Sequence, residues 1–177
     1  IYLLIDLENK SYVTLGEYHF RRFKEHLVLE RFVSFKSRDG LEIPCLLTMP
    51  KKVSGPIPFV VYLHGGPLSH ASPGYDHDVQ FLVNRGYGVL KVNFRGSSGF
   101  GKSFQMKGFK EFGRAMQDDV TDAANWLVAE GFADDEALAV MGTSYGGYSA
   151  ALAMTRDPGL FDAAIVEFPM LDVEFQS

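Results

Sequence analysis

A serine flanked by glycines stands where an expected strand turns into an expected helix. Residues 141–147, Met-Gly-Thr-Ser-Tyr-Gly-Gly, contain the pattern Gly-x-Ser-x-Gly. An apolar run, Ala137 to Met141, precedes it, and residues 148–152 continue with the spacing of one helix face. A serine on such a sharp turn has a strained backbone and an exposed hydroxyl, and glycines remove side chains that would collide there. Ser144 is therefore a candidate nucleophile for attack on a substrate carbonyl.

A second glycine-rich segment supplies candidate oxyanion donors. His64-Gly65-Gly66-Pro67 follows the apolar run Phe59 to Leu63 and so lies at the carboxyl end of a buried strand, where open α/β sheets bind ligands. In α/β-hydrolases, one amide of such a loop and the amide after the nucleophile stabilise the oxyanion. We predict Gly66 and Tyr145 as these donors, and His64 as a structural hydrogen-bonding residue rather than the base. A tight Gly-Pro turn is the alternative interpretation.

A third segment matches a motif for different chemistry. Gly96 to Ser103 has the phosphate-binding pattern Gly-x-x-x-x-Gly-Lys-Ser and follows an expected strand, Val89 to Phe94. Its amides would surround phosphates, and Lys102 would reach the terminal phosphate. Against nucleotide binding, Gly108 and Gly113 interrupt the helix that should follow, and no strand ends in the aspartate that usually holds magnesium. A long glycine-rich loop beside the active-site cleft is the preferred interpretation.

Strands and helices alternate around these motifs. The apolar patterns predict strands at 59–63, 89–94, 137–141 and 163–166, with helices around 79–83 and 118–127 and after residue 144. This order predicts a right-handed, doubly wound α/β sheet. Upstream, strands are expected at 2–7, 11–15, 30–35 and 41–48, and the charged segment 17–30 reads as a linker.

The composition excludes several classes of protein. An apolar content of 46% in 177 residues allows one domain with a core, and the net charge of −5 argues against a nucleic-acid partner. No apolar run approaches the roughly 20 residues of a membrane span. The single cysteine, Cys45, predicts a small buried side chain and a reducing compartment. Because no basic signal region is present, we expect a cytoplasmic location. The start at Ile1 suggests a fragment or a processed chain.

Four segments together resemble a known family. The segments are His64-Gly65-Gly66-Pro67, Gly86-Tyr87-Gly88-Val89, Asn93 to Gly101 and Gly142 to Gly147. In order and spacing, they are similar to the catalytic domain of the prolyl oligopeptidase family of serine peptidases, with most similarity to its acylaminoacyl-peptidase and dipeptidyl-peptidase-like branch. The resemblance covers nearly the whole chain. It also explains the phosphate-loop match as a coincidence, because the Arg-Gly-Ser-x-Gly-x-Gly loop belongs to this family.

The resemblance implies a fold and a domain organisation. Residues 1–16 resemble the end of a last β-propeller blade, residues 17–30 a linker, and residues 31–177 the N-terminal part of an α/β-hydrolase catalytic domain. The sheet would therefore be incomplete and lack the last strands of that fold.

The resemblance also implies an activity on short peptides, with release of an acylated amino acid or a dipeptide. Ser144 would be the nucleophile, and Gly66 and Tyr145 the oxyanion donors. Further residues would line the site: His64, Gly65, Pro67, Asn93, Arg95 and Gly96. No metal or organic cofactor, nucleic acid or membrane is implied, and a homo-oligomer is possible. A carboxylesterase-like hydrolase and a non-catalytic α/β-hydrolase module are the alternatives, followed by the nucleotide binder.

The chain departs from the family pattern in its catalytic triad. In α/β-hydrolases the serine is followed along the chain by an acid and then by a histidine. All five histidines of this chain precede Ser144: His19, His26, His64, His70 and His77. Asp157, Asp162 and Asp172 follow it, but the family's aspartate lies further on. We therefore expect the acid and the base beyond Ser177, and little or no activity from these residues alone.

Overall fold

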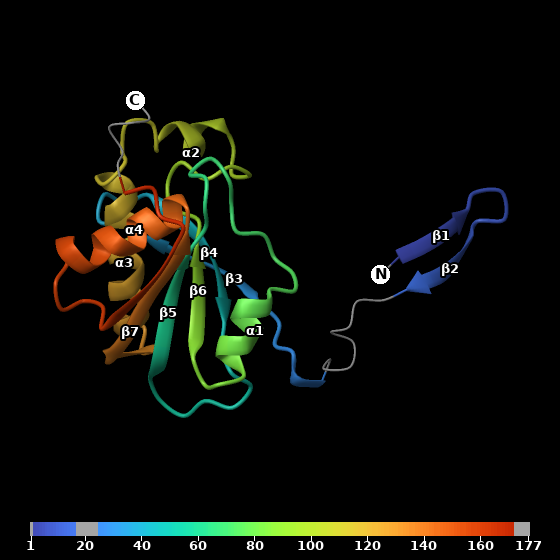
Figure 1. Cartoon of the computed structure of the whole chain (residues 1–177), viewed down its shortest axis with the longest axis horizontal. Helices are drawn as coiled ribbons and strands as arrows, with labels where there is room; N and C mark the ends of the chain where they lie inside the picture. Colours follow the sequence, from blue (N-terminus) through green and yellow to red (C-terminus); the bar gives the residue numbers. More distant parts are fainter. Residues whose placement is uncertain (1, 17–24, 172–177) are drawn as a thin grey trace.

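The computed structural model describes residues 2–16 and 25–171 (Figure 1). The strands are β1 (Tyr2–Asp6), β2 (Ser11–Gly16), β3 (Arg31–Lys36), β4 (Glu42–Thr48), β5 (Ile57–Leu63), β6 (Gly88–Val92), β7 (Ala133–Thr143) and β8 (Ala163–Glu167). The helices are α1 (His77–Val83), α2 (Lys102–Met106), α3 (Ala115–Ala129) and α4 (Tyr145–Arg156). No helix in these two ranges combines the length and apolar character that a membrane crossing requires.

Strands β3 to β8 form one six-stranded sheet in the order β3-β4-β6-β5-β7-β8. Strands β6, β5, β7 and β8 run parallel to one another, whereas β4 pairs antiparallel with both β3 and β6. All five residues of β6 are buried, as expected for a strand that is covered on both faces. The predicted alternation of strands and helices is therefore confirmed.

Neighbouring residues of the central strands face different helices. Val60 of β5 and Met141 of β7 pack with Val79 of α1. The adjacent residues Val61 and Val140 belong to the larger core that includes α3 and α4. Successive side chains of a strand point to opposite faces, so helices cover both faces of the sheet (Figure 1). The sheet is doubly wound, as predicted.

The sheet order brings the two glycine-rich motifs together. Strands β5 and β7 are adjacent and parallel, and Leu63 of β5 lies opposite Gly142 of β7. The loop after β5 and the turn after β7 consequently leave the same edge of the sheet side by side. This edge is the carboxyl end of the parallel strands, where ligand sites of open α/β sheets occur.

The start of β7 and the region after Lys102 differ from the sequence-based expectation. Strand β7 begins at Ala133 rather than at residue 137, because Ala133 pairs with Ile57 of β5 before the two strands shift register. The sequence patterns also gave little support for a helix after Lys102, yet the five-residue helix α2 forms there. Its last turn closes with the Lys107 amide donating to the Phe104 carbonyl at 3.2 Å.

The N-terminal part consists of a hairpin and a packed entry segment. Strands β1 and β2 form a separate antiparallel sheet, as expected from the sequence (Figure 1). Residues 17–24 of the expected linker lie outside the described residues. Its last residues belong to the packed domain, because the Val28 backbone exchanges hydrogen bonds of 2.9 and 2.8 Å with the Gln80 side chain. Glu30 forms a buried ion pair with Lys91 of β6 at 2.5 Å. The packed domain therefore starts before Arg31.

Candidate active site

Ser144 is the single residue between β7 and α4. Its backbone has φ 58° and ψ −116°, a conformation that residues other than glycine rarely adopt. Neighbouring backbone groups hold this conformation: the Ser144 amide donates to the Glu167 carbonyl at 2.9 Å, and the Tyr148 amide donates to the Ser144 carbonyl at 3.0 Å. A strained residue held by its surroundings is typical of a functional site.

The glycines on both sides of Ser144 are required by close backbone contacts. A Cβ atom on Gly146 would lie 2.2 Å from the Leu63 carbonyl oxygen, and one on Gly142 would lie 2.4 Å from the carbonyl carbon of Gly146. Both distances are far below van der Waals contact. The prediction that these glycines remove colliding side chains is therefore confirmed, and their small size lets α4 approach the end of β5.

The loop after β5 lies against the nucleophile turn. A Cβ atom on Gly65 would be 3.0 Å from the Thr143 carbonyl oxygen and 3.4 Å from Ser144 Cβ, so the two backbones are in contact. Gly66 is exposed and has φ 44°. Among the described residues, the amides of Gly66 and of Tyr145 have no backbone or side-chain acceptor. Two N–H groups without a described acceptor therefore belong to the residue after Ser144 and to the residue after Gly65, which contacts the Ser144 turn.

His64 is part of the scaffold of this loop. Its Nε2 lies 2.8 Å from Ser97 Oγ, its Nδ1 lies 3.0 Å from the Gly65 carbonyl oxygen, and its ring stacks on Phe94 at 4.3 Å. Burial lowers the pKa of the imidazole. Both ring nitrogens already have partners, so the ring is fixed and positions the chain that leads into Gly66.

Arg95 and Asn93 support the loops rather than lining the main cavity. The Arg95 guanidinium binds Asp119 with two hydrogen bonds of 2.9 and 2.7 Å, and its other side contacts Asp39 at 2.7 Å. Asn93 Oδ1 accepts from the Ala71 amide at 2.7 Å. Both had been expected to line the site. Their polar groups are bound by the protein itself and neither residue lines the cavity beside Ser144, so a role in lining the site stays a prediction.

The Arg95–Asp39 contact predicts a pH dependence of stability. Hydrogen bonding to the guanidinium lowers the pKa of Asp39 to about 2. The usual value of about 3.9 applies in the unfolded chain, so the contribution is complete above pH 4 and is lost as the pH falls towards 2. We expect the free energy of unfolding to fall more steeply over this range in the wild type than in Asp39→Asn. Denaturant titrations at pH 5, 4, 3 and 2.5 would check this, and equal slopes would contradict it.

A cavity of about 890 Å³ opens beside the nucleophile turn. Three of the predicted site residues line it, Pro67, Gly96 and Tyr145. The Tyr145 ring is buried between aromatic neighbours, which raises the pKa of its hydroxyl. Most of the wall is apolar and comes from residues that the sequence interpretation did not single out: Met106, Phe109, Phe112, Met116, Tyr148 and Met170. Four of the six lie between residues 106 and 116, so a local excess of large apolar side chains marks this segment, although their spacing does not show which of them turn inward.

The phosphate-loop interpretation is not supported by the hydrogen bonds of its loop. The amides of Gly96, Ser97 and Ser98 donate to the carbonyls of Phe104, Phe94 and Ser69, at 3.3, 3.1 and 2.9 Å. These amides are turned towards protein acceptors and not towards a common centre. The helix that follows has only five residues. Of this segment, Gly96 lines the cavity beside Ser144.

No acid or base contacts the nucleophile in the part of the chain that the structure describes. The Ser144 hydroxyl has no hydrogen bond there to a histidine or a carboxylate. Asp157 accepts from the Thr121 hydroxyl at 2.7 Å, and Asp162 accepts from the Leu138 amide at 3.0 Å. Asp172 lies outside the described residues. Within residues 2–16 and 25–171, no cluster of three or more His, Cys, Asp or Glu residues could hold a metal ion.

Comparison with known proteins identifies the family. The family model described as the prolyl oligopeptidase family matches residues 73–177, more than half of the chain. The chain belongs to the prolyl oligopeptidase family. Within this family it is 41% identical over 141 residues to dipeptidyl aminopeptidase BIII of Pseudoxanthomonas mexicana. The match covers 75% of this chain and 20% of that protein.

Solved structures of this kind share the fold. The acylaminoacyl peptidase of Pyrococcus horikoshii matches with a TM-score of 0.77 and 29% identity, covering 90% of this chain and 26% of that one. A puromycin-hydrolysing peptidase of Mycobacterium tuberculosis matches with a TM-score of 0.85 and 27% identity, covering 98% and 28%. The expected α/β-hydrolase fold of the prolyl oligopeptidase family is thereby confirmed. The chain spans about a fifth of the length of the curated relative.

Proposed function

We propose that this chain carries the nucleophile and the oxyanion hole of a serine peptidase that acts on short peptides. The observation that carries the proposal is the strained Ser144 turn, with the unpaired amides of Gly66 and Tyr145 beside it. Related proteins named dipeptidyl aminopeptidase and acylaminoacyl peptidase support release of a dipeptide or of an acylated amino acid.

The geometry suggests how the reaction proceeds. Ser144 Oγ attacks the scissile carbonyl carbon and its proton passes to a general base, which forms a tetrahedral intermediate with a negative oxygen. The two amides donate to this oxygen, and preorganised donors of this kind lower the barrier by about 3 kcal/mol each. The leaving amine takes up the proton when the intermediate collapses to an acyl-enzyme, which water then hydrolyses. We propose that the base and its orienting acid come from outside the described residues.

The apolar cavity is the proposed site for the side chain of the residue whose carbonyl is attacked. It begins at Tyr145 and Pro67, directly beside the nucleophile turn and the oxyanion loop. Its wall of aromatic and methionine side chains favours a large apolar group, because burial of such a group is worth roughly 1.5–3 kcal/mol.

A serine-reactive fluorophosphonate probe tests the proposal on the full-length protein. We expect about one label per chain in the wild type, no label in Ser144→Ala, and normal labelling of Ser103→Ala, which removes an exposed serine on α2. The labelled enzyme should lose hydrolysis of peptide amides. Hydrolysis of aryl esters with no hydrolysis of peptides would instead indicate an esterase. Absence of labelling in the folded wild type would indicate a non-catalytic module.

A further inference from the structure

Among the described residues that line the cavity beside Ser144, the charged ones are all basic. Lys110 and Arg114 line it, and none of the described residues that line it is acidic. Both side chains are exposed, and neither forms an ion pair with a described residue. The chain as a whole has a net charge of −5, so the positive charge at this cavity is opposite in sign to the charge of the whole chain.

The acidic residues near these cations are occupied elsewhere. Glu111 is the only acid between residues 102 and 117, and its carboxylate accepts from the Ala115 amide at 3.2 Å, at the start of α3. Asp118 is bound by Arg38 at 3.0 Å and by Arg156. Glu111 keeps its negative charge, but among the described residues neither carboxylate forms an ion pair with Lys110 or Arg114.

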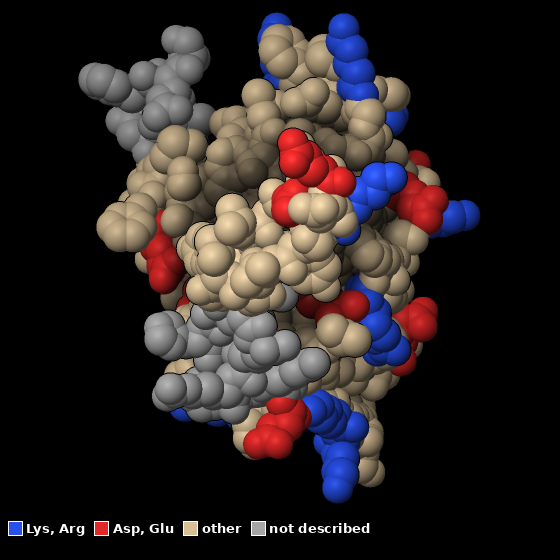
Figure 2. Space-filling view, turned by 90° about the vertical axis from the view of Figure 1, so that its right-hand side faces the viewer, with Lys and Arg blue, Asp and Glu red and all other residues tan. Residues whose placement is uncertain are grey.

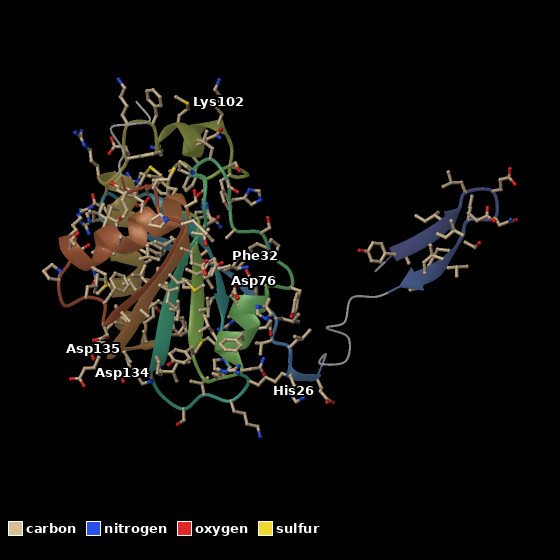
Figure 3. The ribbon with its side chains drawn as sticks, in the orientation of Figure 1. His26, Phe32, Asp76, Lys102, Asp134 and Asp135 are labelled. Atoms are coloured by element: carbon tan, nitrogen blue, oxygen red, sulfur yellow. The ribbon has the colours of Figure 1, made fainter. Side chains whose placement is uncertain are left out.

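Several cations lie at the end of the molecule that carries the proposed site. The segment from residue 102 to residue 114 contains four cations: Lys102, Lys107, Lys110 and Arg114. Figure 3 shows Lys102 projecting from α2 at the top, whereas Asp134 and Asp135 lie at the opposite end of the sheet. Figure 2 shows Lys and Arg side chains projecting from the same top end. Lys110 and Arg114 of this group line the cavity, where their charges attract anions.

The Arg114 backbone is held firmly, whereas its side chain forms no hydrogen bond or ion pair with a described residue. Its carbonyl accepts from Arg156 Nη1 at 3.2 Å and from the Gln117 and Asp118 amides at 2.9 Å each. The guanidinium therefore starts from a fixed point on the cavity wall. A planar guanidinium can bind a carboxylate with two parallel hydrogen bonds, and a neighbouring ammonium adds charge.

We propose that the cavity binds a substrate that combines a large apolar side chain with a carboxylate, and that Arg114 and Lys110 bind the carboxylate. This inference rests on the proposed function and names its substrate class. The carboxylate is either the free C-terminus of a short peptide or an acidic side chain. In either case, Arg114 and Lys110 are specificity-determining residues, and the bond cleaved at Ser144 is unchanged.

Matched peptides test the inference on the full-length protein. All peptides are blocked at the N-terminus and have an aromatic residue before the scissile bond. The first pair differs only in a free C-terminal carboxylate or a C-terminal amide. The second pair has a C-terminal amide and differs only in Glu or Gln after the bond. We expect kcat/KM to be about fivefold higher for one carboxylate form than for its neutral counterpart at low salt, because exposed pairs of this kind contribute up to about 1 kcal/mol. The form that shows the preference identifies the source of the carboxylate.

The variants separate a charge effect from a structural one. Arg114→Gln combined with Lys110→Gln should bring the acid-to-neutral ratio close to one, and Arg114→Lys should restore part of it. Lys36→Gln removes an exposed charge on β3, away from the cavity, and should leave the ratio unchanged. In the wild type the preference should shrink in about 0.5 M salt, where screening is strong. An acid-to-neutral ratio that is the same in the wild type and in the double variant overturns the inference, while the proposed function stands.

Binding keeps the inference testable without catalysis. Calorimetric titration of Ser144→Ala with the acid and neutral peptides should show the same roughly fivefold preference in Kd. If the wild type hydrolyses neither peptide but this preference is present, the proposed function fails and the carboxylate site stands. Equal affinity for both peptides overturns the carboxylate site.

Discussion

Replacing Ser144 with alanine is expected to lower kcat for peptide hydrolysis by the full-length protein at least about a thousandfold. Removal of the nucleophile in serine peptidases leaves only the residual rate that comes from the oxyanion hole and substrate binding. KM should change little, because Gly66, Tyr145 and the cavity wall keep their positions. Steady-state kinetics with a peptide anilide, and with active-site titration to exclude traces of wild type, would measure the effect.

The same variant should fold normally. The Ser144 hydroxyl has no hydrogen bond to another residue in the part of the chain that the structure describes, so its loss should change the free energy of unfolding by less than about 0.5 kcal/mol. A Ser144→Ala enzyme that retains more than a tenth of the wild-type kcat would show that another group is the nucleophile. A large loss of stability would show that the hydroxyl has a structural role.

Replacing Gly146 with alanine is expected to destabilise the domain by about 3 kcal/mol, the upper end of the usual cost of overpacking. The new Cβ atom would lie 2.2 Å from the Leu63 carbonyl oxygen, 2.8 Å from its carbonyl carbon and 2.9 Å from the His64 carbonyl oxygen. All three contacts are with backbone atoms, so no side-chain rotation relieves them. Either α4 or the end of β5 must shift, and both carry the proposed site.

Thermal unfolding would show this as a decrease in Tm of about 6–12 °C for a domain of this size. Activity should fall together with stability, because a shift of β5 moves the loop that leads into Gly66. Gly16→Ala is the matched control: its new Cβ atom would lie 3.7 Å from the Tyr2 side chain, an ordinary contact, and its φ is not in the left-handed region. If the Tm of Gly146→Ala equals that of Gly16→Ala, the two backbones are not in the close contact described here.

The elements that local spacing defines were predictable. Glycines at 142 and 146 around a serine, and the apolar runs that become β5 and β6, depend on steric and periodic rules that act over a few residues. The alternation of strands and helices followed from the same patterns. The α/β architecture and the Ser144 turn could therefore be inferred before any contact between distant residues was known.

The roles of the buried polar residues were not predictable in this way. Arg95 stands in a glycine-rich loop, which indicated a residue of the site wall, whereas its partner Asp119 lies 24 residues further on in α3. The cavity wall was missed for a related reason. Residues 104–116 have no helical or strand period, so nothing local shows which side chains turn inward.

By itself, the sequence determined the candidate nucleophile, the candidate oxyanion loop and the class of fold, because each depends on short-range geometry that glycine and apolar spacing express directly. Only the tertiary structure decided that β5 and β7 are neighbours, that Gly65 contacts the Ser144 turn, and that Lys110 and Arg114 border an apolar cavity. These relations depend on strand order and on packing between segments that are distant along the chain. The local pattern of residues carries no direct record of them.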